Sequence, residues 1–136
     1  MDVDVVTGAT GHIGNVLVRK LLTAGRAVRA LVLPDDDRRP LEGLNAEIVP
    51  GDVTDPESLK AAFAGSQRVF HLAGIVTIMP GMASTLERVN VGGMRNVIAA
   101  CRACGVRRLI YTSSIHAIAE PAHGTVIDET QPFDPD

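Results

Sequence analysis

Residues 5–14 read VVTGATGHIG, an apolar strand followed by a turn with three glycines and the start of a helix. Each glycine does something that a side chain would prevent. Gly8 lets the chain turn tightly, Gly11 lets backbone N–H groups approach a pyrophosphate, and Gly14 lets the helix pack against the strand. The positive N-terminal end of the helix then faces the phosphates. The turn therefore predicts a dinucleotide-binding site, with cofactor contacts from Gly8, Thr10, Gly11, His12, Ile13 and Gly14.

A glycine-rich turn can also be purely geometric, so the elements around it decide the interpretation. Apolar runs predict strands, and amphipathic stretches that end in glycine predict helices between them. The predicted strands are residues 3–7, 27–33, 47–49, 68–72 and 107–112, and the predicted helices are residues 12–24, 56–64 and 84–104. This alternation is typical of right-handed βαβ crossovers. The fold class is therefore α/β, a doubly wound, Rossmann-like parallel sheet of five strands in the order 3-2-1-4-5, with its ligand site between strands 1 and 4.

The composition limits the class of protein. The chain has 136 residues, of which 46% are hydrophobic, enough for one domain with a sizeable core. Its formal net charge of −3 and pI of 5.8 give no overall basic character for nucleic acid or an anionic membrane. Its longest apolar stretch is too short to span a bilayer, and its start lacks the features of a secretory signal. We therefore expect a cytoplasmic protein that binds neither nucleic acid nor a membrane.

Two cysteines, Cys101 and Cys104, form a C-x-x-C pair. They fall in the last turn of a predicted helix, whereas a reactive pair gains its low pKa at a helix N-terminus. No second Cys or His pair offers the spacing of a zinc site. We predict buried, reduced thiols and no metal site.

The glycine spacing, G-x-x-G-x-x-G preceded by a threonine, resembles the fingerprint of the extended short-chain dehydrogenase/reductase family. Four further stretches extend the resemblance over most of the chain: GDVTD at 51–55, HLAG at 71–74, VNVGGMRNV at 89–97 and LIYTSS at 109–114. In pattern the chain is most similar to the dihydroflavonol-reductase-like and 3β-hydroxysteroid-dehydrogenase-like branch of the NAD-dependent epimerase/dehydratase group.

The resemblance implies roles for the residues that end the third and fourth strands. Asp52 would bind the adenine amino group, with Val53 beside the ring; the alternative for this stretch is a helix-capping turn. The wall behind the cofactor ribose and diphosphate would be formed by Leu72, Ala73 and Gly74.

Three polar residues further along the chain are also implicated. Asn90 would lie near the active site and help fix the backbone there, and a satisfied core asparagine is the alternative. Ser114 would be the catalytic serine that hydrogen-bonds the substrate carbonyl or hydroxyl, and a capping hydroxyl at a strand end is the alternative. Thr112 is grouped with the cofactor-binding residues, although a structural role also suits it.

The choice of cofactor is decided after the second strand, where an acid binds the ribose 2′-OH of NAD and an arginine accepts the 2′-phosphate of NADP. Leu33 occupies the discriminating position and offers neither group. Asp35 stands 21 residues after Gly14, and two more acids and then Arg38 and Arg39 share its loop. We expect NADP or NAD, with a slight preference for NADP through Arg38 or Arg39.

One departure from the family is large. Its chemistry uses a tyrosine as proton donor and a lysine four positions later. The only tyrosine here, Tyr111, has Ile115 four residues on, and the only lysines are Lys20 and Lys60. The family's tyrosine follows the loop that closes this sequence, and its substrate lobe comes later still.

We therefore interpret residues 1–114 as an incomplete NAD(P)-binding domain and residues 115–136 as a loop leading toward a missing catalytic and substrate-binding part. The resemblance implies an oxidoreductase that interconverts a carbonyl substrate and a secondary alcohol, like a dihydroflavonol 4-reductase. The alternatives are a non-catalytic NAD(P)-binding sensor or regulatory domain and an NAD-dependent sugar epimerase/dehydratase. This chain alone is expected to be inactive, and to self-associate through its last strand.

Overall fold

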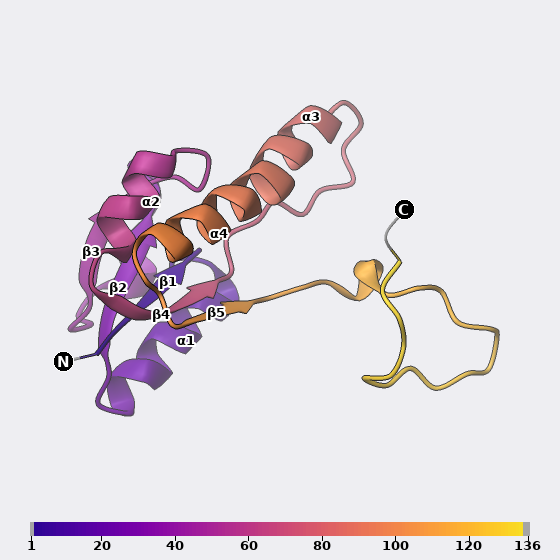
Figure 1. The fold of residues 1–136 in the computed structure, drawn as a ribbon, viewed down its shortest axis with the longest axis horizontal. Coiled ribbons are helices and arrows are strands. Elements are labelled where there is room, and N and C mark those ends of the chain that lie inside the picture. The colour runs from indigo at the N-terminus through magenta and orange to yellow at the C-terminus, as the bar shows by residue number, and fades with distance from the viewer. Residues whose placement is uncertain (1, 135–136) are drawn as a thin grey trace.

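Five parallel strands form one sheet in the order β3-β2-β1-β4-β5 in the computed structural model, which describes residues 2–134 (Figure 1). The strands are β1 (Val3–Thr7), β2 (Ala27–Val32), β3 (Glu47–Pro50), β4 (Ser66–His71) and β5 (Arg108–Tyr111). The order and the parallel pairing confirm the predicted doubly wound sheet. The chain adds β2 and β3 on one side of β1 and then β4 and β5 on the other, so the strand order reverses between β1 and β4.

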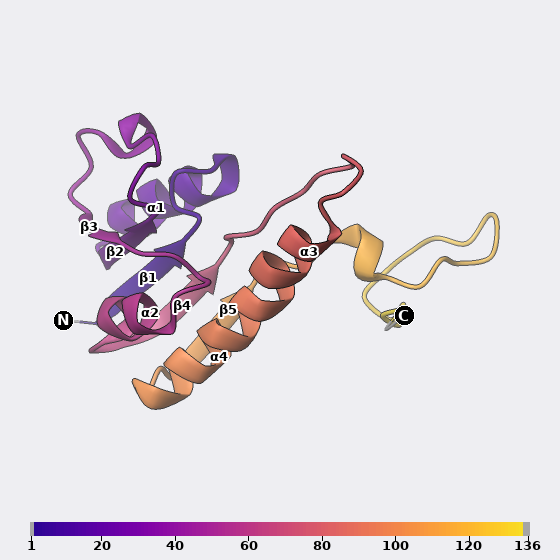
Figure 2. The ribbon, with the colours of Figure 1, turned by 90° about the horizontal axis from the view of Figure 1, so that it is seen from above.

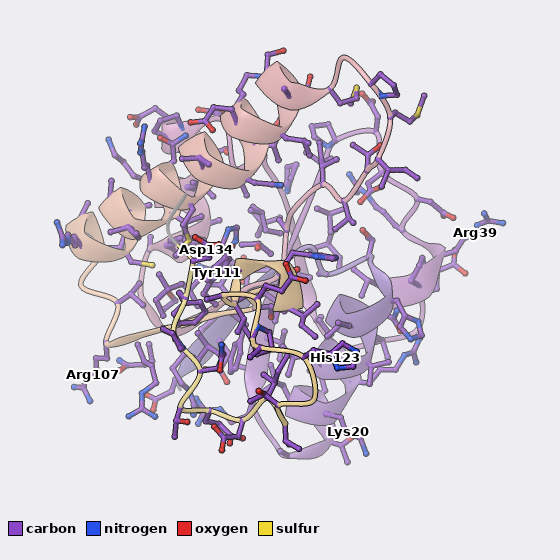
Figure 3. All side chains as sticks on the ribbon, turned by 90° about the vertical axis from the view of Figure 1, so that its right-hand side faces the viewer. Lys20, Arg39, Arg107, Tyr111, His123 and Asp134 are labelled. Carbon is purple, nitrogen blue, oxygen red and sulfur yellow. The ribbon has the colours of Figure 1, made fainter. Side chains whose placement is uncertain are left out.

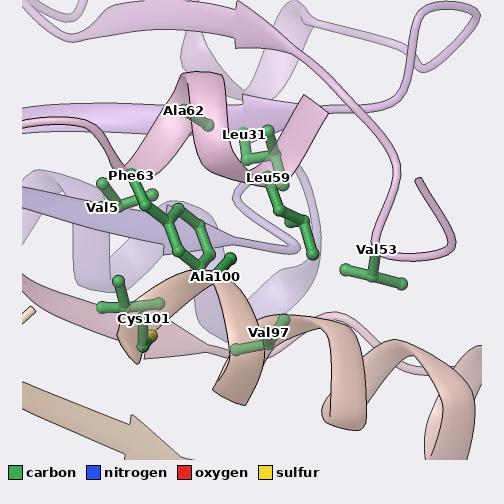
Figure 4. Close-up of a cluster of buried hydrophobic side chains, with 10 residues drawn as sticks. Val5, Leu31, Val53, Leu59, Ala62, Phe63, Val97, Ala100 and Cys101 are labelled. Atoms are coloured by element: carbon green, nitrogen blue, oxygen red, sulfur yellow. The ribbon is translucent and has the colours of Figure 1, made fainter. Parts of the chain in front are cut away.

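Helices cover both faces of the sheet (Figure 2). They are α1 (His12–Thr23), α2 (Pro56–Phe63), α3 (Ala83–Leu86) and α4 (Gly93–Ala103). The strands alternate their side chains between the two faces, so Val6 packs with Val18 of α1 on one side. On the other side Val5 packs with Phe63 of α2 and Val97 of α4 (Figure 4). Two apolar cores therefore hold the sheet and fix the strand ends that carry the site.

The helix predicted over residues 84–104 is present, but its middle is a π-helix and not a regular α-helix. It begins as α3, passes through a π-helix (Glu87–Gly92) and continues as α4. A Cβ at Gly93 would lie 2.8 Å from the side chain of Val53, so this glycine permits close packing between α4 and the turn after β3. The strand β4 starts two residues earlier than predicted. Ser66 pairs with Val3 of β1, but its polar side chain gave no indication of a strand in the sequence.

Cys101 lies on α4 and is buried in the core, and Cys104, at the end of the same helix, is partly exposed. Both are free thiols. Burial raises the pKa of Cys101 to about 11, and the neighbouring Cys104 adds to this. The prediction of buried thiols is therefore confirmed for Cys101 and wrong for Cys104, which lies just after the end of α4.

Beyond β5 the chain leaves the sheet, as Figure 1 shows. It forms a short 3-10 turn (Ile115–Ala117) and one isolated antiparallel bridge between Ile118 and Phe133. The boundary at residue 114 and self-association through β5 stay predictions, and residues 135–136 of the predicted loop lie outside the described residues. Within residues 2–134 no helix is both long and apolar enough to cross a membrane.

Candidate cofactor-binding site

A cavity of about 320 Å³ opens at the carboxyl end of the sheet, between the parallel strands β1 and β4, where the strand order reverses. Nine of the predicted residues line it: Gly8, Thr10, Gly11, Leu33, Asp52, Val53, Leu72, Ala73 and Gly74. A larger, shallower hollow of about 570 Å³ lies at the amino end between α1 and β3 and contains none of them. Ligands of doubly wound sheets bind at the carboxyl end, so the smaller cavity is the candidate site.

The glycine turn brings three pieces of backbone unusually close together. Gly8 has a φ of +65°, and a Cβ there would lie 2.8 Å from the backbone nitrogen of Ala73. A Cβ at Gly14 would lie 2.0 Å from the carbonyl oxygen of Gly8. Gly11 is the N-cap of α1, and no side chain caps this helix. The amide groups that begin α1 therefore remain available to an anion.

A threonine joins the ends of β1 and β4 beside this turn. The Thr7 hydroxyl accepts hydrogen bonds from the backbone N–H groups of Leu72 and Ala73, at 3.2 and 3.1 Å. It also lies 2.8 Å from Nδ1 of His71. Since both lone pairs of the hydroxyl are occupied, it donates its own proton to Nδ1, which leaves the hydrogen of the imidazole on Nε2. Thr7 thereby positions two residues of the cavity wall.

His71 is almost completely buried, with 1% of its surface exposed. Its ring stacks on Tyr111 at the end of β5, with the ring centroids 5.6 Å apart. Burial lowers the pKa of His71 from 6.5 to about 4. The imidazole is therefore neutral at physiological pH and serves as a fixed hydrogen-bond acceptor for Thr7.

Two carboxylates, Asp52 and Asp55, lie in the turn after β3, and only Asp55 caps a helix. Asp55 accepts a hydrogen bond from the backbone N–H of Glu57 and caps α2, as predicted. Asp52 is not wholly free, because its Oδ1 accepts the N–H of Thr54 at 2.8 Å. Within residues 2–134 no hydrogen bond engages its second carboxylate oxygen, which remains available to a donor.

Asn90 does not line the cavity but fixes a residue that does. Its Oδ1 accepts the N–H of Ile75 at 2.8 Å, and its Nδ2 donates to the carbonyl of Ile75 at 2.9 Å. The side chain therefore pairs with the backbone of the β4–α3 loop as a neighbouring strand would. This contact is satisfied on both sides and lies next to the site.

In the loop after β2, Asp36 lines the cavity, whereas Arg38 and Arg39 do not. The Thr10 hydroxyl donates to Asp36 at 2.5 Å, and Asp36 lines the cavity. Arg38 is exposed and is not part of the lining. Arg39 pairs with Asp37 at 2.7 Å and points away from the protein in Figure 3. The hydrogen bond from Arg39 holds the pKa of Asp37 below its usual range.

The remaining predicted residues lie outside the lining. Ser114 accepts the backbone N–H of His116 at 3.3 Å and so caps the 3-10 turn that follows it. Thr112 continues the strand pairing, because its N–H donates to the carbonyl of His71. His12, Ile13 and Gly14 form the first turn of α1 and are not part of the lining.

Six lining residues were not predicted: Leu31, Asp36, Gly51, Ile75, Arg88 and Val89. Arg88 is the only cationic side chain among the lining residues within the described part of the chain. It stands on the π-helix, two residues before Asn90, and nothing in the local sequence marks it. Asp36 belongs to the acidic run after β2, where the sequence did not indicate which acid faces the cofactor.

The fold, the glycine turn and the cavity at the strand reversal define an NAD(P)-binding domain of the short-chain dehydrogenase/reductase class. More narrowly, the chain belongs to the 3-beta hydroxysteroid dehydrogenase/isomerase family, whose sequence profile matches residues 5–135. The resemblance inferred from the motifs is thereby confirmed.

Curated relatives are considerably longer than this chain. Sterol demethylase protein B of Methylococcus capsulatus is 41% identical over 96% of this chain and 40% of its own length. A putative dihydroflavonol 4-reductase of Synechocystis sp. is 38% identical over 92% of this chain and 36% of its own length. The chain therefore spans about two fifths of the length of these relatives.

Solved structures with similar folds include two that hold NAD. A short-chain dehydrogenase/reductase superfamily protein from Agrobacterium tumefaciens with bound NAD matches with a TM-score of 0.81 and 33% identity, over 98% of this chain and 39% of that one. The UDP-glucose 4-epimerase of Thermus thermophilus in complex with NAD matches with a TM-score of 0.83 and 29% identity, over 98% of this chain and 44% of that one.

Proposed function

We propose that this chain is the cofactor-binding part of an oxidoreductase that interconverts a carbonyl and a secondary alcohol. The observation that carries the proposal is the cavity at the strand reversal, where the glycine turn faces Asp52 and Val53. The relative from Synechocystis, described as a putative dihydroflavonol 4-reductase, supports reductase chemistry. A sugar epimerase is the second candidate, supported by the likeness to the Thermus thermophilus epimerase.

The chain alone is proposed to bind cofactor without turning over substrate. Reduction of a carbonyl needs a proton donor, and the sequence has no Tyr-x-x-x-Lys pair to supply it. Ser114 can donate a hydrogen bond, but its hydroxyl is too weak an acid to replace a tyrosine. The proton donor and the substrate lobe would come from the rest of a longer protein.

Calorimetric titration with NAD tests the proposed cofactor binding, and a variant of Arg88 tests the proposed contact with the cofactor phosphates. Arg88 is expected to neutralise the cofactor diphosphate, because it is the one cation in the lining and no hydrogen bond or ion pair within residues 2–134 engages its guanidinium. Replacing it by alanine should weaken NAD binding about tenfold, roughly 1.4 kcal/mol, as expected for a lost charge-assisted hydrogen bond. Binding of adenosine, which has no phosphate, should not change.

Arg95→Ala is the matched control, since Arg95 is exposed on the following helix and is not part of the lining. Gly11→Val, which places a side chain where the phosphate approaches, should abolish binding. An intact fold that gives no heat with millimolar NAD or NADP contradicts the proposed function.

For the cofactor we propose NAD, which replaces the slight preference for NADP drawn from the loop composition. Asp36 lines the cavity and would accept the ribose 2′-OH, whereas a 2′-phosphate would meet its negative charge. Arg38 lies outside the lining and Arg39 is paired with Asp37. Both solved relatives named above hold NAD, which supports the same choice.

Competition titrations of the two cofactors check this choice. The chain is expected to bind NAD at least about tenfold more tightly than NADP. Asp36→Ala should reduce this difference in affinity, because it removes the carboxylate that repels the 2′-phosphate of NADP. Arg38→Ala should leave both affinities unchanged. Tighter binding of NADP that is lost in Arg38→Ala would refute the choice of NAD.

A further inference from the structure

A hollow distinct from the two described above, with an unusual charge, lies at the amino end of the strands, opposite the cofactor cavity. Its volume is about 310 Å³, and it is lined by Asp2, Arg26, Gln67, Arg68, Arg107 and Arg108. Four of these six residues are arginines, although the whole chain carries a net charge of −3. The local charge is therefore opposite in sign to that of the protein.

A buried carboxylate fixes two of the arginines. Asp4 is fully buried in β1. It accepts hydrogen bonds from Nε and Nη2 of Arg26 at 2.9 and 3.0 Å, and from Nε of Arg68 at 2.9 Å. Burial raises the pKa of Asp4, but these hydrogen bonds more than offset it and hold the pKa below its usual range. Asp4 is thus ionised, and it orients both guanidinium groups.

The cluster of Asp4, Arg26 and Arg68 has excess positive charge and N–H donors that Asp4 does not engage. One carboxylate balances only one of the two arginines, so Asp4, Arg26 and Arg68 together keep a net charge of +1. Each guanidinium carries five N–H donors in a rigid plane. Arg26 uses two groups and Arg68 uses one on Asp4, so both retain donors on their outer side.

The other two arginines add charge that no acid compensates. Arg108 of β5 is the register partner of Arg68 on β4, so their side chains leave the same face of the sheet on adjacent strands. Like charges in neighbouring strand positions destabilise a sheet. Within the part of the chain that the structure describes, no ion pair or hydrogen bond engages the guanidinium of Arg107 or Arg108. Figure 3 shows Arg107 pointing outward at the edge of the molecule.

We propose that this arginine hollow is a second anion-binding site, which takes a phosphate group. Counting Asp2 and Asp4 against the four arginines leaves a net charge of +2 at the hollow. A phosphate dianion matches this charge, and its oxygens accept from planar guanidinium forks that approach from different strands. The phosphate is either the free ion or the monoester of a small molecule, since both present the same group.

The arginine hollow is independent of the cofactor cavity. The two lie at opposite ends of β1 and β4, separated by roughly 17–20 Å for strands of this length at about 3.3 Å per residue. Neither cavity shares a lining residue with the other. The proposal therefore goes beyond the proposed function and does not rest on it.

Titration of the ¹⁵N-labelled chain with inorganic phosphate, at constant ionic strength set by chloride and in the presence of NAD, tests the proposal by NMR. The backbone amide signals of Gln67, Arg107 and Arg108 are expected to shift and saturate. Signals of Gly8 and Gly11 report separately on the cofactor cavity. A failure of NAD binding would appear there and would leave the phosphate result readable.

Exposed arginines allow variants that keep the fold. Arg107→Gln and Arg108→Gln are each expected to weaken phosphate binding about tenfold, as lost charge-assisted contacts. Arg95→Gln, with the same loss of charge on α4, should bind as the unaltered chain does. A parallel titration with glycerol phosphate distinguishes a phosphate monoester from the free ion. Equal affinities for glycerol phosphate and inorganic phosphate support a monoester, and binding of inorganic phosphate alone supports the free ion.

Two outcomes would overturn the proposal. One is an amide response that chloride alone reproduces at the same ionic strength. The other is an unchanged phosphate affinity in both Arg107→Gln and Arg108→Gln.

Discussion

Gly14→Ala is expected to abolish dinucleotide binding and to lower the free energy of unfolding by about 3 kcal/mol, the upper part of the range for overpacked sites. The added Cβ would lie 2.0 Å from the carbonyl oxygen of Gly8 and 2.9 Å from the Cα of Ala9. Both neighbours are backbone atoms, so no side chain can turn aside to make room. α1 must move away from β1, and the turn that presents amide groups to the phosphates must open.

Denaturant unfolding and NAD titration of the same variant measure the two effects. Gly11→Ala is the matched control for stability, because its Cβ would lie 3.3 Å from the same carbonyl oxygen, which a small shift relieves. Its free energy of unfolding should stay within about 0.5 kcal/mol of the unaltered chain. A Gly14→Ala protein of unchanged stability and affinity would show that the turn tolerates the side chain.

Acidification from pH 6.5 to pH 4 is expected to lower the free energy of unfolding by roughly 3 kcal/mol through His71 alone. Its pKa falls from 6.5 to about 4 on folding, because burial disfavours the imidazolium. Between these values the unfolded chain binds a proton that the folded chain does not. The stabilisation is therefore complete above about pH 6.5 and is lost progressively as the pH falls toward 4.

His71→Asn should flatten this pH dependence. The asparagine oxygen can accept the Thr7 hydroxyl as Nδ1 does, and it does not titrate in this range. His123→Asn, in the exposed tail, is the control and should keep the slope of the unaltered chain. The carboxylate of Asp4 has a pKa below its usual range, so its effect is confined to lower pH. Parallel slopes for His71→Asn and the unaltered chain would disprove the assignment.

Much of the fold was predictable because its signals are local. Apolar runs, the Asp55 cap and glycines at helix ends are read from neighbouring residues, and they located the strands and helices. The strand order was then expected from the alternation of these elements, and the structure confirms it. The glycine turn and the stretches around Asp52 and Leu72 likewise carry their motifs in consecutive residues. Each of these stretches contributes to the lining of the cavity.

The features that were missed depend on distant parts of the chain. Thr7 and His71 are 64 positions apart, and only the pairing of β1 with β4 makes them neighbours. Asp36 is one of three consecutive acids, and the backbone of the loop selects which of them faces Thr10. Arg88 lines the cavity from a π-helix, a feature that no residue pattern in this stretch predicts.

The π-helix (Glu87–Gly92) joins α3 to α4 in one continuous helix. It changes the rotation about the helix axis of the residues before it relative to those after it. In a regular α-helix each residue advances about 100°, so the directions of Asn90 and Val97 would be rigidly linked. The wider π turn contains one residue more and breaks the link. α4 can therefore keep the rotation that buries Val97 in the core, while Asn90 takes the rotation that holds Ile75. The π turn therefore separates the backbone contact that supports the cavity wall at Ile75 from the packing of Val97 in the interior.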